Sequence, residues 1–167
     1  MNAERSNKSQ QLRGAIAVPA RWALGVLFIY MGLKKAVHPA EFLKLVRQYD
    51  MVSSPFLLNS IAAALPWFEA FCGLLLLAGV AVRGTAVVLV AMLVPFTLLI
   101  LKRALAVASA QGLALCMVKF DCGCGSGEVL ICHKLLENCL LTFLACWLIA
   151  GAGRKLSMRF SLFPNPA

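Results

Sequence analysis

The sequence predicts an all-α polytopic membrane protein, a bundle of four transmembrane helices with one short amphipathic helix at the membrane surface. The first observation is composition: 61% of the 167 residues are hydrophobic and 14% are charged, whereas soluble domains average roughly 45–50% and about 25%. The second is that the apolar residues form long runs separated by short polar clusters, as in membrane proteins. Length favours a single domain, because four spans of about 20 residues would occupy roughly half of the chain.

The first span is predicted at residues 19–33, behind a polar, basic tail at 1–16. No A-x-A type cleavage site follows this apolar stretch, so we expect the span to be retained rather than removed as a signal peptide. Pro19 suits the first turn of a helix, where its missing N–H costs nothing. Lys34 and Lys35 end the span, and we expect both side chains to reach back to the membrane surface.

A short amphipathic helix is predicted after the first span. Its apolar residues recur at helical spacing, with charged and polar residues between them, which is typical of a helix that lies on a membrane. The apolar positions are Phe42, Leu45, Val46 and Tyr49.

The second and third spans are predicted at residues 57–82 and 85–101, with Pro66 and Pro95 marking kinks inside them. The uncharged segment 104–118 is short for a span. A helix continued to residue 118 would measure about 50 Å, against a bilayer core of about 30 Å. We therefore expect a helix that leaves the membrane or folds back along its surface, with a fifth span as the alternative.

A cysteine-rich loop at 116–133 precedes the last predicted span, at 135–152, and a tail follows at 154–167. Glycines at 123, 125 and 127 indicate a turn in this loop. The membrane domain therefore covers 17–153 and has both ends on one side. Charge does not orient it, because eight Lys and Arg residues fall on each side.

Cys122 and Cys124 are the strongest candidates for chemistry among the seven cysteines, an odd number that cannot pair fully within one chain. Their sulfurs can meet only in a tight turn, which the flanking glycines allow. Such a bridge is strained and easily reduced, which suits a catalytic couple. Lys119 and His133 lie close enough in sequence to stabilise a thiolate. The alternatives are two unpaired thiols or a metal site.

Cys116 and Cys132 are the candidate resolving partners of that couple. Cys132 begins the last predicted helix, and helix N-termini favour thiolates; the alternative is a small buried residue. A zinc or iron–sulfur site is a further alternative, but the spacing usual for metal-binding cysteines is absent, so no metal is predicted. Its ligands would come from Cys116, Cys122, Cys124, Cys132 and His133.

The remaining cysteines are interpreted as packing residues. Cys132, Cys139 and Cys146 are seven residues apart and therefore share one helix face. Small residues on one face of a membrane helix usually mark close contact with a neighbouring helix. Cys72, in the second span, receives the same interpretation.

Glu69 is a carboxylate inside a predicted span, and an acid in that position is a functional hypothesis by default. It would accept protons beside a quinone or relay them to the thiols. The structural alternative is an interhelical partner for Arg21, Lys35 or a backbone group.

Three motifs resemble the DoxX and MauE families of bacterial membrane proteins. They are RWALGVLFIYMGLKKAVHPAEF at 21–42, LPWFEAFCGLLLLAG at 65–79, and Cys-Gly-Cys-Gly at 122–125 before the last helix. The resemblance implies a four-helix bundle in the bacterial inner membrane with both termini cytoplasmic. It also implies a redox association, because MauE-type proteins are linked to disulfide formation in periplasmic partners, alongside a thioredoxin-like protein.

The leading hypothesis is a thiol–disulfide oxidoreductase component in the lipid bilayer. Cys122 and Cys124 would exchange electrons with a periplasmic thioredoxin-like partner and pass them to quinone near Glu69. The alternative is a structural or assembly subunit bound to other membrane-complex subunits; a small-solute transporter has little support. The net charge of +9 is distributed around the spans, which favours lipid headgroups over nucleic acid.

Overall fold

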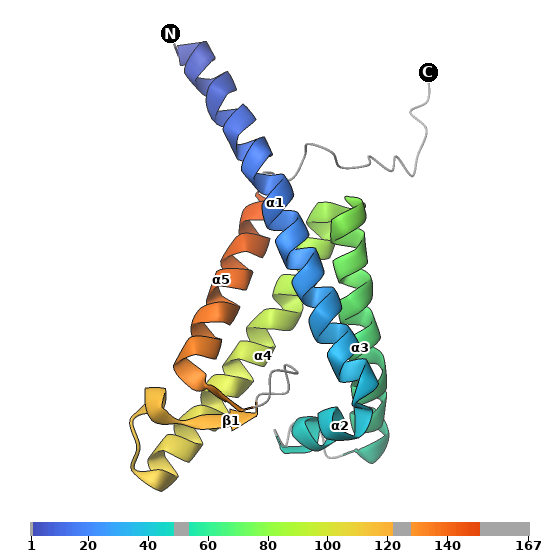
Figure 1. The fold of residues 1–167 in the computed structure, drawn as a ribbon, viewed down its shortest axis with the longest axis vertical. Coiled ribbons are helices and arrows are strands. Elements are labelled where there is room, and N and C mark those ends of the chain that lie inside the picture. Colours follow the sequence, from blue (N-terminus) through green and yellow to red (C-terminus); the bar gives the residue numbers. More distant parts are fainter. Residues whose placement is uncertain (1, 49–53, 122–127, 151–167) are drawn as a thin grey trace.

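The computed structural model describes residues 2–48, 54–121 and 128–150 of the chain (Figure 1). Cys122, Cys124, Tyr49 and the predicted tail at 154–167 lie outside the described residues. The elements, in order, are α1 (Asn2–Val37), α2 (Pro39–Gln48), α3 (Pro55–Ala78), α4 (Val82–Gln111), the 3-10 turn η1 (Leu115–Met117), β1 (Lys119–Asp121), β2 (Glu128–Leu130) and α5 (Ile131–Ile149).

Four helices in the described part of the chain are long and apolar enough to cross a membrane, which confirms the predicted all-α bundle. These stretches are Ile16–Val37, Pro55–Ala78, Val82–Gln111 and Ile131–Ile149. Only 28–39% of the residues in their apolar windows are buried within the chain. The rest, including Trp22, Phe71 and Phe143, faces outward, and so much exposed apolar surface requires a lipid environment.

The first helix begins much earlier than predicted. Residues 2–15 continue α1 on its N-terminal side, so Pro19 lies inside the helix and not in its first turn. Glu, Arg, Lys and Gln are good helix formers and are frequent in this stretch. Proline is tolerated within membrane helices.

The helices form two pairs, because α1 packs mainly against α3 and α4 mainly against α5. Glycines allow α1 and α3 to approach closely. A Cβ added at Gly32 would lie 2.5 Å from the Pro66 carbonyl oxygen, and one at Gly73 would lie 2.6 Å from the Gly25 carbonyl oxygen. Backbones therefore meet directly at this crossing, as small residues allow in membrane proteins.

The α4–α5 pair is joined by polar groups inside the membrane. The buried Asn138 donates from Nδ2 to Thr97 Oγ1 at 3.2 Å. Thr97 in turn donates to the Leu93 carbonyl at 2.7 Å. Interhelical hydrogen bonds of this kind contribute about 0.6 kcal/mol on average, so they fix register more than they add stability.

In the uncharged segment 104–118, residues 104–111 continue α4 and the chain folds back only after Gly112, so this segment does not add a fifth span to the described part of the chain. Helix α4 continues to Gln111, about 45 Å for its 30 residues. Gly112, with φ of 64°, ends it in the left-handed conformation. The chain then turns through η1 into the two-stranded antiparallel hairpin β1–β2, which the sequence analysis did not predict.

Helix α2 confirms the predicted amphipathic segment. Phe42 is buried, whereas Glu41, Lys44 and Arg47 are exposed. The helix lies at the end of the bundle that carries the hairpin, opposite the N-terminus (Figure 1). This end of the bundle therefore combines the amphipathic helix and the cysteine-rich segment.

We expect Gly32→Ala to destabilise the fold by about 1–3 kcal/mol, the usual cost of overpacking. The new methyl group would meet the Pro66 carbonyl and the Ala70 nitrogen, which are backbone atoms and cannot rotate away. The midpoint of thermal unfolding in detergent would measure this. Gly84→Ala is the matched control, because no atom lies within 4 Å of the added Cβ. Equal midpoints for both variants would show that close contact at Gly32 does not matter.

Candidate functional site: a disulfide and a buried ion pair

The hairpin brings two distant cysteines together. Lys119 pairs with Leu130, and the ladder extends one step further because the Ile131 N–H donates to the Val118 carbonyl at 3.2 Å. Cys116 lies three residues before β1, and Cys132 lies two residues after β2. Strand pairing therefore closes a separation of 16 residues along the chain.

The hairpin is held against α4 by its apolar face. Side chains alternate along both strands: Val118 and Ile131 are buried and Val129 is half-buried, whereas Lys119 and Leu130 are exposed. The buried residues pack on Ile100 and Ala104 of α4, with Phe120 beside them. The position of the cysteines is thus set by packing as well as by the ladder.

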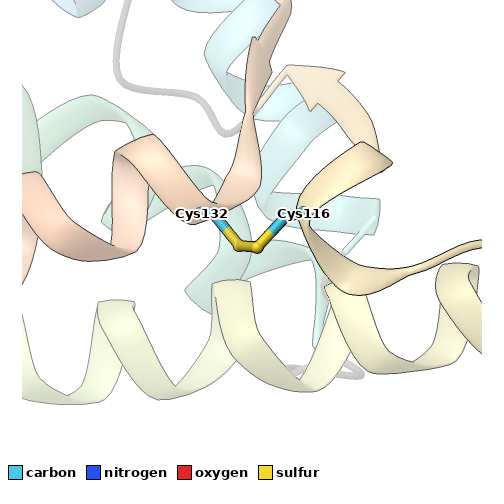
Figure 2. The surroundings of a disulfide bond; sticks show 2 residues. All are labelled: Cys116 and Cys132. Carbon is cyan, nitrogen blue, oxygen red and sulfur yellow. A yellow bond between two sulfur atoms is a disulfide. The ribbon is translucent and has the colours of Figure 1, made fainter.

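Cys116 and Cys132 form a disulfide, with 4.9 Å between their Cα atoms (Figure 2). This separation lies within the range that disulfides require. Cys116 lies in η1 and is exposed, whereas Cys132 lies in the first turn of α5 and is half-buried. The two predicted resolving partners are therefore joined to each other, and Cys132 begins α5 as the sequence predicted.

The packing interpretation holds for one of the other three described cysteines. Cys72 is buried in the core between the helices, as predicted. Cys139 and Cys146 are exposed, so the predicted close contact with a neighbouring helix does not occur within this chain. The inward face of α5 is formed by Leu141, Ala145 and Leu148, which turns the cysteine stripe outward.

Within the described ranges, no three His, Cys, Asp or Glu side chains lie close enough to hold a metal ion. The disulfide occupies the sulfurs of Cys116 and Cys132, which removes two of the five candidate ligands in this state. His133, beside Cys132, is exposed. In the described part of this segment, Cys116 and Cys132 therefore form a disulfide instead of binding a metal ion as thiolates.

Glu69 forms a buried ion pair with Lys35, one of the three partners considered from sequence. Lys35 Nζ lies 2.7 Å from both carboxylate oxygens, and the side chains are 6% and 10% exposed. The rings of Phe42 and Phe96 lie 5.4 and 5.6 Å from the same ammonium group. The expectation that Lys35 reaches the membrane surface is therefore wrong, because an inward carboxylate and two aromatic rings replace its water.

Two buried polar residues of α5 were not found by sequence reasoning. Lys134 is 2% exposed and pairs with Glu137 at 3.0 Å, and Asn138 bonds to Thr97. The available signal was their position: polar side chains near or inside an apolar span tend to face the bundle interior.

A cavity of about 160 Å³ lies beside the Lys35–Glu69 pair. Helices α1, α2, α3 and α4 all contribute to its wall. The lining residues are Phe28, Lys35, Phe42, Leu65, Glu69, Ala91, Met92, Leu93, Pro95 and Phe96. The wall is thus mainly apolar and aromatic, with a single pair of opposite charges.

The family model described as "Methylamine utilisation protein MauE" matches residues 13–151. The match runs from α1 to the end of α5 and includes both the disulfide and the ion pair. No curated protein and no solved structure matches this chain.

We expect Lys35→Met to destabilise the protein by about 3–5 kcal/mol, because it leaves the Glu69 carboxylate buried without a counter-charge. The double variant Lys35→Met/Glu69→Gln removes both charges and should recover most of that loss. Thermal unfolding in detergent measures these two variants and Glu69→Gln alone, with exposed Lys102→Met as the control. If the double variant were as unstable as the sum of its single changes, the two side chains would not be coupled.

Proposed function

The chain belongs to the MauE family, whose model it matches over residues 13–151, and we propose that it is a membrane-embedded thiol–disulfide redox component. It works with a periplasmic thioredoxin-like protein and passes electrons to a membrane quinone. The observation that carries this proposal is the Cys116–Cys132 disulfide at the end of the bundle, with one cysteine exposed and the other at a helix N-terminus.

The asymmetry of the pair gives each cysteine a role. A thiolate of the partner attacks the exposed Cys116 sulfur, and the sulfur–sulfur bond breaks towards Cys132. Cys132 leaves as a thiolate in the first turn of α5, where the helix dipole favours negative charge. The second thiol of the partner then attacks the mixed disulfide and releases Cys116.

This exchange transfers two electrons and two protons. The partner's dithiol becomes a disulfide, and the Cys116–Cys132 disulfide becomes two thiols. Oxidation of these thiols by a quinone restores the disulfide and yields a quinol, so the cycle balances. We propose that Cys122 and Cys124, which lie in sequence between the two strands, form a second couple that exchanges electrons with the partner.

The position of the disulfide supports an orientation that charge alone leaves open. Disulfides persist in oxidising compartments such as the bacterial periplasm and are rare in the cytosol. We therefore place the hairpin and α2 on the periplasmic face of the inner membrane. The N-terminus and the end of α5 lie at the opposite end of the bundle, and thus on the cytoplasmic side (Figure 1).

A chain whose only cysteines are Cys116 and Cys132 should react with a membrane-impermeant maleimide in intact cells only after mild reduction. This outcome requires an accessible disulfide on the outer face. A chain carrying Cys139 alone is the control and should stay unlabelled, because its thiol is exposed within the span and faces lipid. Labelling without reductant would mean that the pair is reduced. Absence of labelling in both conditions would place it in the cytoplasm or bury it in a complex, which favours the subunit alternative.

In Cys132→Ser the Cys116 thiol can still attack the disulfide of the oxidised thioredoxin-like partner, and the mixed disulfide should accumulate because Cys132, which would displace the partner, is gone. Cys116→Ser should trap at least several-fold less, since Cys132 is only half exposed. Non-reducing electrophoresis of acid-quenched cells, followed by mass spectrometry of the adduct, measures both variants. Equal trapping by the two variants would contradict the assigned roles, and trapping by neither would argue against exchange at this pair.

A further inference from the structure

We infer that the cavity beside Lys35 and Glu69 binds the head group of a lipid-soluble, one-ring quinone. The role of this ligand as the electron acceptor rests on the proposed function, whereas its binding rests on the cavity itself. The argument uses the position, size and chemistry of the described lining residues.

The cavity lies within the membrane-spanning part of the protein and reaches its lipid-facing surface. Lys35, Glu69 and the lining residues of α4 all belong to spans. Ala91 and Pro95 line the cavity and are also exposed on the outer surface of α4. A ligand therefore enters from the bilayer, and an isoprenoid tail can stay in lipid while the ring is inside.

The size of the cavity limits the ligand to one ring. Its volume is about 160 Å³, and an apolar protein cavity of about 150 Å³ is known to hold benzene. A single six-membered ring thus fits, whereas a fused two-ring head group requires the wall to move. Phe28, Phe42 and Phe96 provide aromatic surface against which a flat ring can pack.

The charges favour a neutral ligand with a carbonyl group. Lys35 and Glu69 neutralise each other, so an ionic ligand would have to break the pair. An ammonium group has three N–H donors, and the Glu69 oxygens engage at most two of them. The third can donate to a quinone oxygen, and the carboxylate retains lone pairs that can accept from a quinol O–H.

One packed unit connects the cavity to the disulfide. Phe96 lines the cavity and also packs against the cluster formed by Ile100, Ala104, Val118 and Ile131. Ile131 directly precedes Cys132 in sequence, and Val118 belongs to the hydrogen bond that closes the hairpin. Reduction of the ring consumes the two electrons and two protons that the two thiols release, which gives disulfide and quinol.

Equilibrium binding of a radiolabelled decyl-benzoquinone to the full chain in lipid nanodiscs tests this inference, with the Cys116–Cys132 disulfide kept oxidised. We expect saturable binding that empty nanodiscs lack.

Ala91→Phe fills the mouth of the cavity from an exposed position and should weaken binding at least tenfold. Lys35→Met/Glu69→Met, which nearly keeps the shape but removes both the donor and the acceptor, should do the same. Ala106→Phe, an exposed change elsewhere on α4, is the matched control and should bind like the unmodified protein.

A naphthoquinone of equal tail length should compete at least tenfold more weakly than the benzoquinone. Equal competition by the two quinones would overturn the size argument, and unchanged binding in Ala91→Phe would overturn the site. Because binding is measured without turnover, the experiment tests the quinone site independently of the proposed redox function. If the quinone does not bind but the cysteine pair is active, only this site is rejected. If the quinone binds as expected but the cysteine pair is inert, only the proposed function is rejected.

Discussion

The ion pair between Lys35 and Glu69 is the interaction on which the arrangement of the bundle depends. A buried carboxylate without a partner is costly, so α1 and α3 must cross where the Lys35 ammonium reaches Glu69. Gly32 and Gly73 allow that approach by leaving no side chain between the backbones. Phe42 of α2 packs over the same ammonium, which ties the surface helix to the bundle. The cavity is a consequence of this crossing, because polar and aromatic groups meet there without filling the space.

The second constraint is the short hairpin β1–β2, which brings Cys116 and Cys132 into bonding distance although they are 16 residues apart in the sequence. Three-residue strands have little stability alone, but their apolar side chains dock on α4 and hold Cys116 near Cys132. The result places one sulfur at an exposed turn and the other at a helix N-terminus. The same end of the bundle carries α2. Under the proposed function, a partner that approaches this end of the bundle meets the exposed Cys116 sulfur first.

Sequence reasoning predicted the spans and the amphipathic helix because both depend on local composition and periodicity. It also identified Glu69 and included Lys35 among three partners, since a carboxylate in a span stands out. It could not choose between those partners, because the choice depends on how the helices rotate about one another. It named Cys116 and Cys132 as resolving residues but did not pair them, because short strands give almost no periodic signal. The burial of Lys134 was also missed, because it depends on how α5 rotates against the other helices, as the choice of partner for Glu69 does.

The central claim is that Cys116 and Cys132 form a working redox couple rather than a structural crosslink. The most direct measurement is the midpoint potential of this pair in lipid nanodiscs, obtained by equilibration with thiol–disulfide buffers and mass spectrometry of alkylated peptides. Catalytic couples of thioredoxin-like systems titrate between about −120 and −270 mV, and structural disulfides below about −300 mV. We predict a midpoint within the catalytic range. A value below about −300 mV would contradict the claim and identify the disulfide as a structural crosslink that holds the hairpin to α5.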